Sequence, residues 1–516
     1  MKEDLLYKKK KIILLVSVLL VSTSGLAYEL VAGTMATYLI GQSVLQFSFA
    51  MGWFLAAMGL GSYLSRFAKT NILDKILKIQ ILLGLTGGYS AAILFFAFAY
   101  TDTLYPFFLL LALIVGTGVG FEIPIILRLM GEVNILSLAI SDVFTFDYIG
   151  ALFASMVFPL VLLPNLGLIR SSIFFGSMNI LSGFLLISVI NKKENRKDKI
   201  LLTLSGFVLL LGFFFSEKLT RFIEDKLYQD PIILTKDTSY QRIVVTKWRN
   251  DTRLFLDGNL QFSTMDEARY HESLVHVPIA FLKRVPESVL VIGGGDGLAI
   301  RELLKYSEIK SITLVELDPQ MIKLFKDNPN LQKINNNSLS NPKLTIFTMD
   351  AFNFLKENKG ENTYDLILTD LPDPNSYSIG KLYTVSFYLN LFQHLKKDGI
   401  FVTQSTSPLF AKDAYWCIVE TIRFAAYKIN PSIHTIPYHV YIPSFGDWGF
   451  SMSGSNLSPG DFQPIQVSTQ FLSNDLISSL FVFSKDSLPD TPPPINHLDS
   501  QVLIGLYSNA YHRLYE

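Results

Sequence analysis

The stretch "VLVIGGGDGLAIRELLKY", residues 289–306, combines an apolar segment, three consecutive glycines, an aspartate and a helical pattern. A strand followed by a glycine loop and a helix opens many doubly wound α/β sheets, and such a loop usually binds an anionic group. Here the spacing is not G-x-G-x-x-G, and Asp296 in the loop would repel a pyrophosphate. The stretch therefore predicts an α/β fold whose nucleoside ligand carries a positive charge.

Four more apolar segments follow this strand, and helical patterns separate several of them. These segments are "SITLVEL" (311–317), "LTIFTMD" (344–350), "YDLILTD" (364–370) and "GIFVTQS" (399–405). Alternation of this kind predicts a parallel, doubly wound sheet. We therefore expect residues 288–516 to form a Rossmann-like catalytic domain of the methyltransferase type.

Acidic residues stand at or just after the ends of the first four strands. They are Asp296, Glu316, Asp318, Asp350, Asp370 and Asp373. A single acid at such a position is more often a helix N-cap than a ligand-binding group. Acids after four consecutive strands instead predict an anionic pocket at one edge of the sheet, with a cationic ligand. Glu316, about twenty residues after the glycine loop, is expected to accept the ribose hydroxyls of a nucleoside.

Half of the 516 residues are hydrophobic, and they are concentrated in residues 1–216. We predict a multi-span α-helical membrane domain there, because most of its apolar runs can cross a bilayer core of about 30 Å. The predicted spans are 12–33, 45–65, 79–100, 106–127, 143–163, 168–190 and 200–216. The expected location is the cell membrane, with the lipid bilayer as a partner.

Basic residues cluster on one side of these spans, and Arg170 alone falls on the other side. The clusters are Lys8 to Lys11; Arg66, Lys69, Lys75 and Lys78; Arg128; and Lys192, Lys193, Arg196, Lys197 and Lys199. The positive-inside rule makes their side cytoplasmic. A seventh crossing at 200–216 would place the rest of the chain outside. Because that run is short, we expect it not to cross fully, which leaves the catalytic domain in the cytoplasm.

Residues 217–287 are expected to hold a linker and a small β domain. Within it, "RIVVTKWRNDTRLFLDG" (242–258) predicts two strands around an Asn-Asp turn. The formal net charge is zero, so nothing in the composition suggests a nucleic acid partner. Cys417 is the only cysteine, which excludes an intramolecular disulfide framework and a cysteine metal cluster.

Seven separate motifs resemble those of the spermidine synthases, or polyamine aminopropyltransferases, and occur in that family's order. They are "SYQRI" (239–243), "LFLDGNLQFSTMDEARYHESLVH" (254–276), "VIGGGDG" (291–297), "LVELD" (314–318), "MDAF" (349–352), "LTDLPDP" (368–374) and "LYTVSFY" (382–388). The resemblance covers most of residues 235–455, and the apolar part resembles membrane-attached members. It implies transfer of an aminopropyl group from decarboxylated S-adenosylmethionine to putrescine or a similar diamine, without metal or redox cofactor. Such enzymes are often homo-oligomers.

The resemblance also implies roles for individual residues. Asp370 is expected to be the catalytic acid that takes the proton from the attacking amine. The expected donor and methylthioadenosine site comprises Gln241, Gly293, Gly295, Glu316, Asp350 and Ala351. The expected polyamine site comprises Tyr270, His271, Asp296 and Asp373. Asp296 then has a purpose, because the decarboxylated donor presents an ammonium where S-adenosylmethionine presents a carboxylate.

Two departures from the family pattern concern the amine site. Phe445, in "YIPSFGDWGF" (441–450), stands where a tyrosine is common, in a shorter loop. "LTDLPDP" (368–374) has Leu-Pro between its acids in place of Ser-Thr. The acceptor is therefore open, with putrescine as the default.

Two other functions stay open at this point. One is an S-adenosylmethionine-dependent methyltransferase. The other is a membrane polyamine transporter or sensor with a binding-only soluble domain, suggested by acids in or near the spans: Glu29, Glu122, Asp142 and Asp147. These acids could instead lie at interfaces or pair with Arg66 or Arg128.

Overall fold

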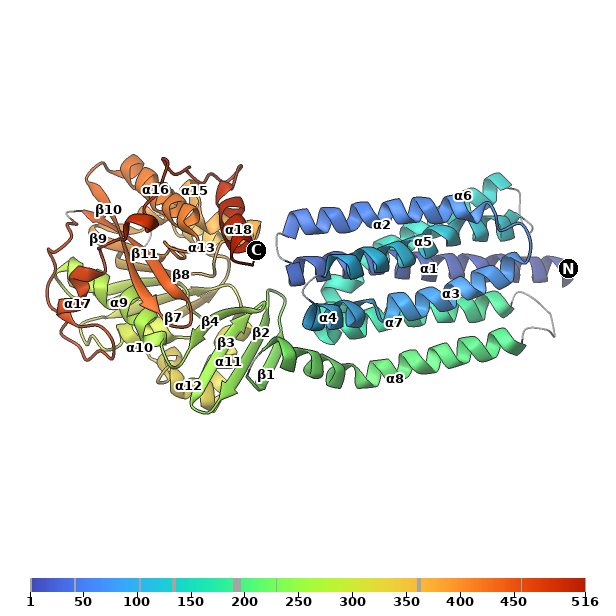
Figure 1. The fold of residues 1–516 in the computed structure, drawn as a ribbon, viewed down its shortest axis with the longest axis horizontal. Coiled ribbons are helices and arrows are strands. Elements are labelled where there is room, and N and C mark those ends of the chain that lie inside the picture. Colours follow the sequence, from blue (N-terminus) through green and yellow to red (C-terminus); the bar gives the residue numbers. More distant parts are fainter. Residues whose placement is uncertain are drawn as a thin grey trace. The chain divides into compact units, whose positions relative to one another are not determined.

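The computed structural model describes residues 2–40, 43–101, 104–131, 136–188, 196–228, 230–359, 363–455 and 457–515. The chain folds as two compact units, residues 1–232 and 233–516 (Figure 1). The first unit is helical, and the second contains both β-sheets. The boundary between the two units lies past residue 216, where we expected the helical domain to end, because the last helix of the first unit continues to Leu227.

The helical unit consists of long apolar helices with short connections. They are α1 (Lys2–Ile40), α2 (Ser43–Ser65), α3 (Ile72–Gly88), α4 (Ser90–Tyr100), α5 (Tyr105–Gly131), α6 (Leu136–Val157), the π-helix η1 (Phe158–Leu162), α7 (Leu163–Ser188) and α8 (Arg196–Leu227). Within the described residues, five helices are long and apolar enough to cross a membrane. The count rises to six if α3 and α4, which meet at a 44° bend, form one span.

Two predicted spans, 143–163 and 168–190, belong to one apolar stretch, Ser137–Ser188. That stretch passes through the π-helix and breaks at Gly167, whose φ of 71° and ψ of 178° are not helical. Proline and a π-bulge are common causes of a helix kink, and Pro159 lies in the π-helix itself. The break therefore falls between the two predicted spans.

The run 200–216 differs from our expectation. It lies inside α8, which is 32 residues long, because the charged residues on both sides of the run continue the helix. Helix α8 lies along α7: Leu202 contacts the Cα region of Gly183, and Arg170 Nε donates to Ser216 Oγ at 2.8 Å. The run is therefore part of a longer helix than we expected, and by length and composition α8 can span a membrane.

Glycines allow α2 and α5 to touch closely. A Cβ on Gly61 of α2 would come 1.9 Å from the carbonyl oxygen of Thr117, and one on Gly120 of α5 would come 1.9 Å from that of Met58. Small residues at such positions bring helix backbones into contact, as in membrane helix pairs. A larger side chain at either glycine would force the two helices apart.

The second unit begins with a four-stranded sheet in the order β1-β2-β3-β4. Its strands are β1 (Ile232–Asp237), β2 (Arg242–Trp248), β3 (Asp251–Leu256) and β4 (Asn259–Ser263). The predicted hairpin forms, but Trp248 pairs with Asp251, so the turn consists of Arg249 and Asn250. We expected an Asn-Asp turn, and this was wrong by one residue, because Arg249 adopts the left-handed conformation (φ 54°).

A seven-stranded sheet follows, in the order β10-β11-β9-β8-β5-β6-β7. Its strands are β5 (Ser288–Gly293), β6 (Ser311–Glu316), β7 (Leu344–Thr348), β8 (Tyr364–Asp370), β9 (Leu395–Gln404), β10 (Ile433–Ile442) and β11 (Gly446–Ser455). Strands β5 to β9 run parallel, which confirms the Rossmann-like prediction. The β10–β11 hairpin adds an antiparallel edge.

Helices cover both faces of this sheet. They are α9 (Glu267–Leu282), α10 (Leu298–Leu303), α11 (Pro319–Asp327), α12 (Pro329–Ile334), α13 (Ala351–Glu357), α14 (Tyr377–Gly380), α15 (Val385–Phe392), α16 (Lys412–Ile429), α17 (Asn474–Ser479) and α18 (Val502–Tyr515). Strand β5 shows why two layers form: Val289 and Val291 face one apolar core, and Leu290 and Ile292 face the other. The carboxyl ends of the parallel strands are thereby fixed at one edge of the sheet.

Candidate active site

The glycine loop and Asp370 meet because β5 pairs with β8. Gly293, the last residue of β5, lies opposite Asp370, the last residue of β8. A Cβ at Gly293, where φ is 78°, would come 2.1 Å from the carbonyl oxygen of Asp370. Only glycine fits this position, so the loop can start directly beside the acid.

The carboxylate of Asp370 is oriented by Tyr270. Tyr270 is buried in α9, and its hydroxyl donates to Asp370 Oδ1 at 2.7 Å. Burial and the neighbouring Asp370 carboxylate raise the pKa of Tyr270 well above its usual value, so the phenol keeps its proton. The second oxygen, Oδ2, lies beside the loop, where a Cβ on Gly294 would be 3.0 Å from it. One oxygen is thus fixed by the protein while the other faces the glycine loop.

His271, Asp296 and Asp370 converge at the edge of the sheet. One ring nitrogen of His271 and one carboxylate oxygen of each acid lie within 4.8 Å of one another. His271 follows Tyr270 in α9, and the two rings meet edge to face with centroids 5.0 Å apart. Three residues that are 25 and 74 positions apart along the chain are thereby gathered into one charged cluster.

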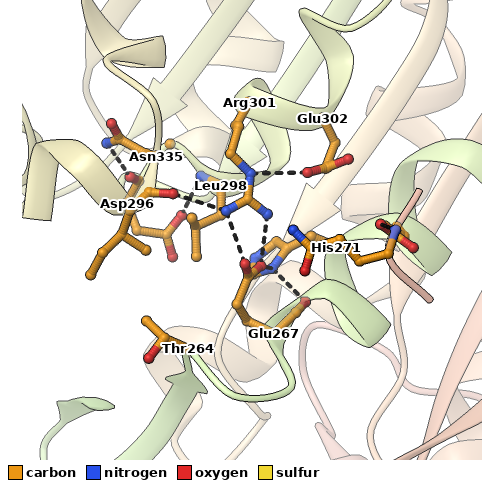
Figure 2. A network of polar contacts seen from close by, with 12 residues as sticks. Thr264, Glu267, His271, Asp296, Leu298, Arg301, Glu302 and Asn335 are labelled. Carbon is orange, nitrogen blue, oxygen red and sulfur yellow. Dashed lines mark hydrogen bonds and ion pairs between the residues drawn. The ribbon is translucent and has the colours of Figure 1, made fainter. Parts of the chain in front are cut away.

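A buried ion network holds His271 in place (Figure 2). His271 Nδ1 lies 2.8 Å from Glu267 Oε2, and Arg301 Nη1 lies 2.9 Å from Glu267 Oε1. Although burial opposes protonation of His271, the Glu267 carboxylate outweighs it, and the pKa of His271 rises to about 9. A doubly protonated imidazole has no lone pair for a metal. The cluster therefore combines one cationic ring with two carboxylates.

Asp296 is fixed in the loop by one backbone N–H nearby and by one distant side chain. Its Oδ1 accepts from the Leu298 N–H at 2.9 Å, and its carbonyl oxygen accepts from Asn335 Nδ2 at 2.8 Å (Figure 2). Burial raises the pKa of Asp296 to about 6, with His271 opposing the shift and Asp370 adding to it. An ammonium bound in the cluster would therefore stabilise the ionised form of Asp296, which burial makes costly.

Asp373 is held by residues from two later segments. Tyr507 of α18 donates its hydroxyl to Asp373 Oδ2 at 2.8 Å, and Gln404 Nε2 lies 3.5 Å from Oδ1. The same Gln404 amide donates to the carbonyl oxygen of Leu371 at 2.7 Å. Burial raises the pKa of Asp373 to about 6, and the bond from Tyr507 opposes this shift. Asp373 is thus a second partly desolvated carboxylate at the same edge.

Glu316 closes the other side of the loop. Its Oε2 accepts from the Gly295 N–H at 3.1 Å and its Oε1 from the Asp318 N–H at 2.9 Å. Burial raises the pKa of Glu316 to about 7, although the Asp318 N–H lowers it. A Cβ on Gly295 would lie 2.7 Å from Glu316 Oε2, so the glycine permits this contact. Gln241 joins the group through Asp318, because its Nε2 lies 3.1 Å from Asp318 Oδ2.

Two of the acids at the strand ends are helix N-caps. Asp318 caps α11 by accepting from the Gln320 N–H, and Asp350 caps α13 by accepting from the Asn353 N–H. Asp350 Oδ2 also pairs with Lys381 Nζ at 2.7 Å, and the neighbouring Ala351 is buried. Asp370 and Glu316 are not caps. The N-cap interpretation therefore holds for part of the set, while the carboxylates nearest the glycine loop have other partners.

The β10–β11 turn brings Phe445 to the site. Asp266, just before α9, accepts from the Ser444 N–H at 2.7 Å and from its hydroxyl at 2.9 Å. Phe445, the next residue, meets Tyr270 edge to face with centroids 6.5 Å apart. The shorter loop identified in the sequence thus places an aromatic ring beside Tyr270.

Sequence reasoning missed several residues of the site. Glu267 carried a usable signal, because it precedes His271 by four residues and both lie in one helix. Tyr507, Gln404 and Lys381 carried none, since their contacts depend on how distant segments pack. Tyr507 reaches Asp373 across 134 positions of sequence.

Comparison with known proteins points to one family. The model of the spermine/spermidine synthase domain matches residues 267–454. The chain is 41% identical over 513 residues to a polyamine aminopropyltransferase of Leptospira interrogans, covering 97% of this chain and 99% of that protein. It is 40% identical over 519 residues to polyamine aminopropyltransferase 2 of Ralstonia nicotianae, covering 97% and 98%.

A solved spermidine synthase in complex with the transition state analogue AdoDATO is 25% identical, with a TM-score of 0.45 and coverage of 53% of this chain and 88% of that one. The two full-length alignments include the helical unit as well as the α/β unit, so the likeness is not confined to the catalytic sheet. The chain therefore belongs to the spermine/spermidine synthase family, together with polyamine aminopropyltransferases that match it over nearly its whole length.

Proposed function

We propose that the protein is a polyamine aminopropyltransferase that acts as a spermidine synthase. It transfers the aminopropyl group of decarboxylated S-adenosylmethionine to a diamine, with putrescine as the default, and yields spermidine and methylthioadenosine. The observation that carries the proposal is the convergence of His271, Asp296 and Asp370 beside the glycine loop. A cluster with more acids than bases suits two cationic substrates.

The donor fits the loop side of this cluster. Glu316, tied to the Gly295 N–H, would accept ribose hydroxyls, and Gln241, Asp350 and Ala351 would line the nucleoside. Asp296 would hold the terminal ammonium of the donor. This favours the decarboxylated donor over S-adenosylmethionine, whose carboxylate Asp296 would repel. The methyltransferase alternative is disfavoured for the same reason.

The reaction is a displacement at the carbon next to sulfur. The amine nitrogen forms a bond to this carbon, the carbon–sulfur bond breaks, and its electron pair returns to sulfur to give a neutral thioether. The attacking amine is an ammonium at neutral pH and must first lose a proton. Asp370 Oδ2, beside the loop, would accept it, while Tyr270 holds Oδ1.

The remaining work of the site is orientation. Asp373 would hold the distal ammonium of the diamine, and Tyr270, His271 and Phe445 would line the path of its methylene groups. A neutral leaving group needs no protonation, and the family needs no cofactor besides the donor. With proton acceptor, donor loop and amine-binding acids all present, the binding-only sensor alternative has less support than catalysis.

The helical unit is proposed to span a lipid bilayer. Many large apolar side chains on its helices are exposed, as expected for lipid-facing positions; examples are Tyr148, Leu152, Leu160 and Phe214. The catalytic unit is proposed to lie on the cytoplasmic side, where the donor nucleoside is made. If α8 crosses the bilayer, the basic clusters then lie outside, against the positive-inside rule. The two orientation arguments therefore disagree and can be tested against each other.

Asp370→Asn is expected to lower kcat by roughly 10²–10⁴-fold, because a positioned base contributes about that much. Calorimetry should show methylthioadenosine binding unchanged, since Glu316 and the glycine loop remain. Asp327→Asn, on the exposed end of α11, is the matched control and should keep full activity. Wild-type turnover in Asp370→Asn would refute the assigned role.

Glu316→Gln is expected to weaken methylthioadenosine binding far more than diamine binding. Each charge-assisted hydrogen bond to a ribose hydroxyl contributes about 1.5–3 kcal/mol, and the amide can accept but no longer carries the charge. Both affinities can be measured by calorimetry on the same preparation. Equal losses for the two ligands would contradict a ribose-binding role.

The kcat/KM for the diamine, measured with saturating donor, is expected to fall as the pH drops below about 6. Asp373, which would hold the diamine, has a raised pKa of about 6, so it is charged above this pH and neutral below it, while the diamine stays cationic throughout. Asp373→Asn should show a lower plateau and a shallower fall. A profile that is flat from pH 5 to 8 would contradict recognition of the diamine by Asp373.

A pair of reporters decides the orientation, one active only in the cytoplasm and one only outside, fused to either terminus. We expect the cytoplasmic reporter to work at the C-terminus and the outside reporter to work at the N-terminus. Cytoplasmic activity at both ends would mean that α8 does not cross. Outside activity at the C-terminus would overturn the cytoplasmic assignment.

A further inference from the structure

Glu122 lies in the interior of the helical unit and has no role in the proposed aminopropyl transfer. It belongs to α5, and its side chain is fully buried. Its Oε1 accepts from Gln80 Nε2 at 2.7 Å and from Asn179 Nδ2 at 3.4 Å. An acid among apolar helices is costly and is often kept for function.

The partners of Glu122 are also hydrogen-bonded to one another. Asn179 Nδ2 also donates to Gln80 Oε1 at 2.9 Å, and the Tyr28 hydroxyl donates to Asn179 Oδ1 at 2.8 Å. All four side chains are at most 1% exposed, and they come from α1, α3, α5 and α7. Four helices therefore contribute one polar group each to a single buried site.

The second carboxylate oxygen of Glu122 is different. Oε2 is buried and has no hydrogen-bond partner among the residues that the structure describes. Within that same part of the chain no lysine, arginine or histidine pairs with Glu122: Lys11 pairs with Asp142, and Arg128 donates to the Ser65 and Ala68 carbonyls. An ionised carboxylate with a bare oxygen and no counter-ion is strongly disfavoured in an apolar interior. A proton on Oε2 removes that charge.

We propose that Glu122 is a proton-binding site at the centre of the helical unit, separate from the aminopropyl transfer site. When the proton leaves, its bonding electron pair stays on the carboxylate, and the two amide donors at Oε1 stabilise the charge in part. Of the side chains hydrogen-bonded in this network, Tyr28 is the only other titratable group in the described structure. Loss of the proton therefore places a negative charge without a counter-ion in a network that joins four helices.

A small cavity adjoins the Tyr28 end of the network. The cavity beside Tyr28, lined also by Phe54, Ser90 and Leu94, measures about 10 Å³. This is about the room that one water molecule needs. An alkylammonium of polyamine size does not fit in this cavity, which Tyr28 lines but Glu122, Gln80 and Asn179 do not.

Infrared spectroscopy of the purified full-length protein at neutral pH tests the proposal. The wild type should show the carbonyl stretching band of a protonated carboxylic acid, and Glu122→Gln should lose the intensity of one such group. Asp74→Asn, at an exposed position in the first turn of α3, is the control and should keep the band. Loss of an ionised-carboxylate band in Glu122→Gln instead, or an unchanged carboxylic acid band, would overturn the proposal.

A second variant keeps the proposal testable if Glu122→Gln does not fold. Gln80→Leu removes the 2.7 Å hydrogen bond to Oε1 but leaves the acid itself in place. The carboxylic acid band of Glu122 should then move to higher frequency without losing intensity, because a carbonyl with fewer donors is stiffer. A band that stays at the wild-type frequency would show that it does not come from Glu122.

Discussion

The pairing of β5 with β8 is the constraint on which the catalytic site depends. It sets Gly293 against Asp370 at a distance that leaves no room for any side chain on the glycine. The loop therefore leaves the sheet directly beside the acid, and strand pairing sets the backbones of the glycine loop and Asp370 next to each other. If the donor binds at the loop and Asp370 accepts the proton, as we propose, this arrangement exists before substrate binds, which lowers the cost of reaching the reactive geometry.

The buried carboxylates at this edge of the sheet repel one another, and a bound cation would reduce that repulsion. Burial raises the pKa of Asp296 and Asp373 to about 6 and that of Glu316 to about 7, so these carboxylates are costly to ionise. His271, kept cationic by Glu267, offsets part of this cost. Arg301 in turn pairs with Glu267, so the charge of this carboxylate is shared between Arg301 and His271. The network in Figure 2 thus supports the cluster without occupying the place of the substrate.

The sequence was sufficient for features that depend on local pattern. Strand ends, the glycine loop and the acids at the sheet edge are encoded within a few residues, and the structure brings together Tyr270, His271, Asp296 and Asp370 as expected. Asp318 and Asp350 show which ambiguity remains. An acid just after a strand can be a helix N-cap or a ligand-binding group, and the sequence alone does not distinguish the two. The pattern also underestimated the length of α8, since charged residues beyond an apolar run can continue a helix for several turns.

What the sequence could not supply were contacts set by the packing of distant segments. Tyr507 reaches Asp373 only because α18 packs against α14 and α16, and Phe445 reaches Tyr270 only because Asp266 anchors the β10–β11 turn. Both residues lie outside the parallel strands that fix the glycine loop and Asp370. The glycine loop and Asp370 therefore depend on strand pairing, whereas Asp373 and Tyr270 also have partners from other parts of the fold. Under the proposed roles, changes in the turn or in the C-terminal helix would alter which amine is held without disturbing the pairing of Gly293 with Asp370.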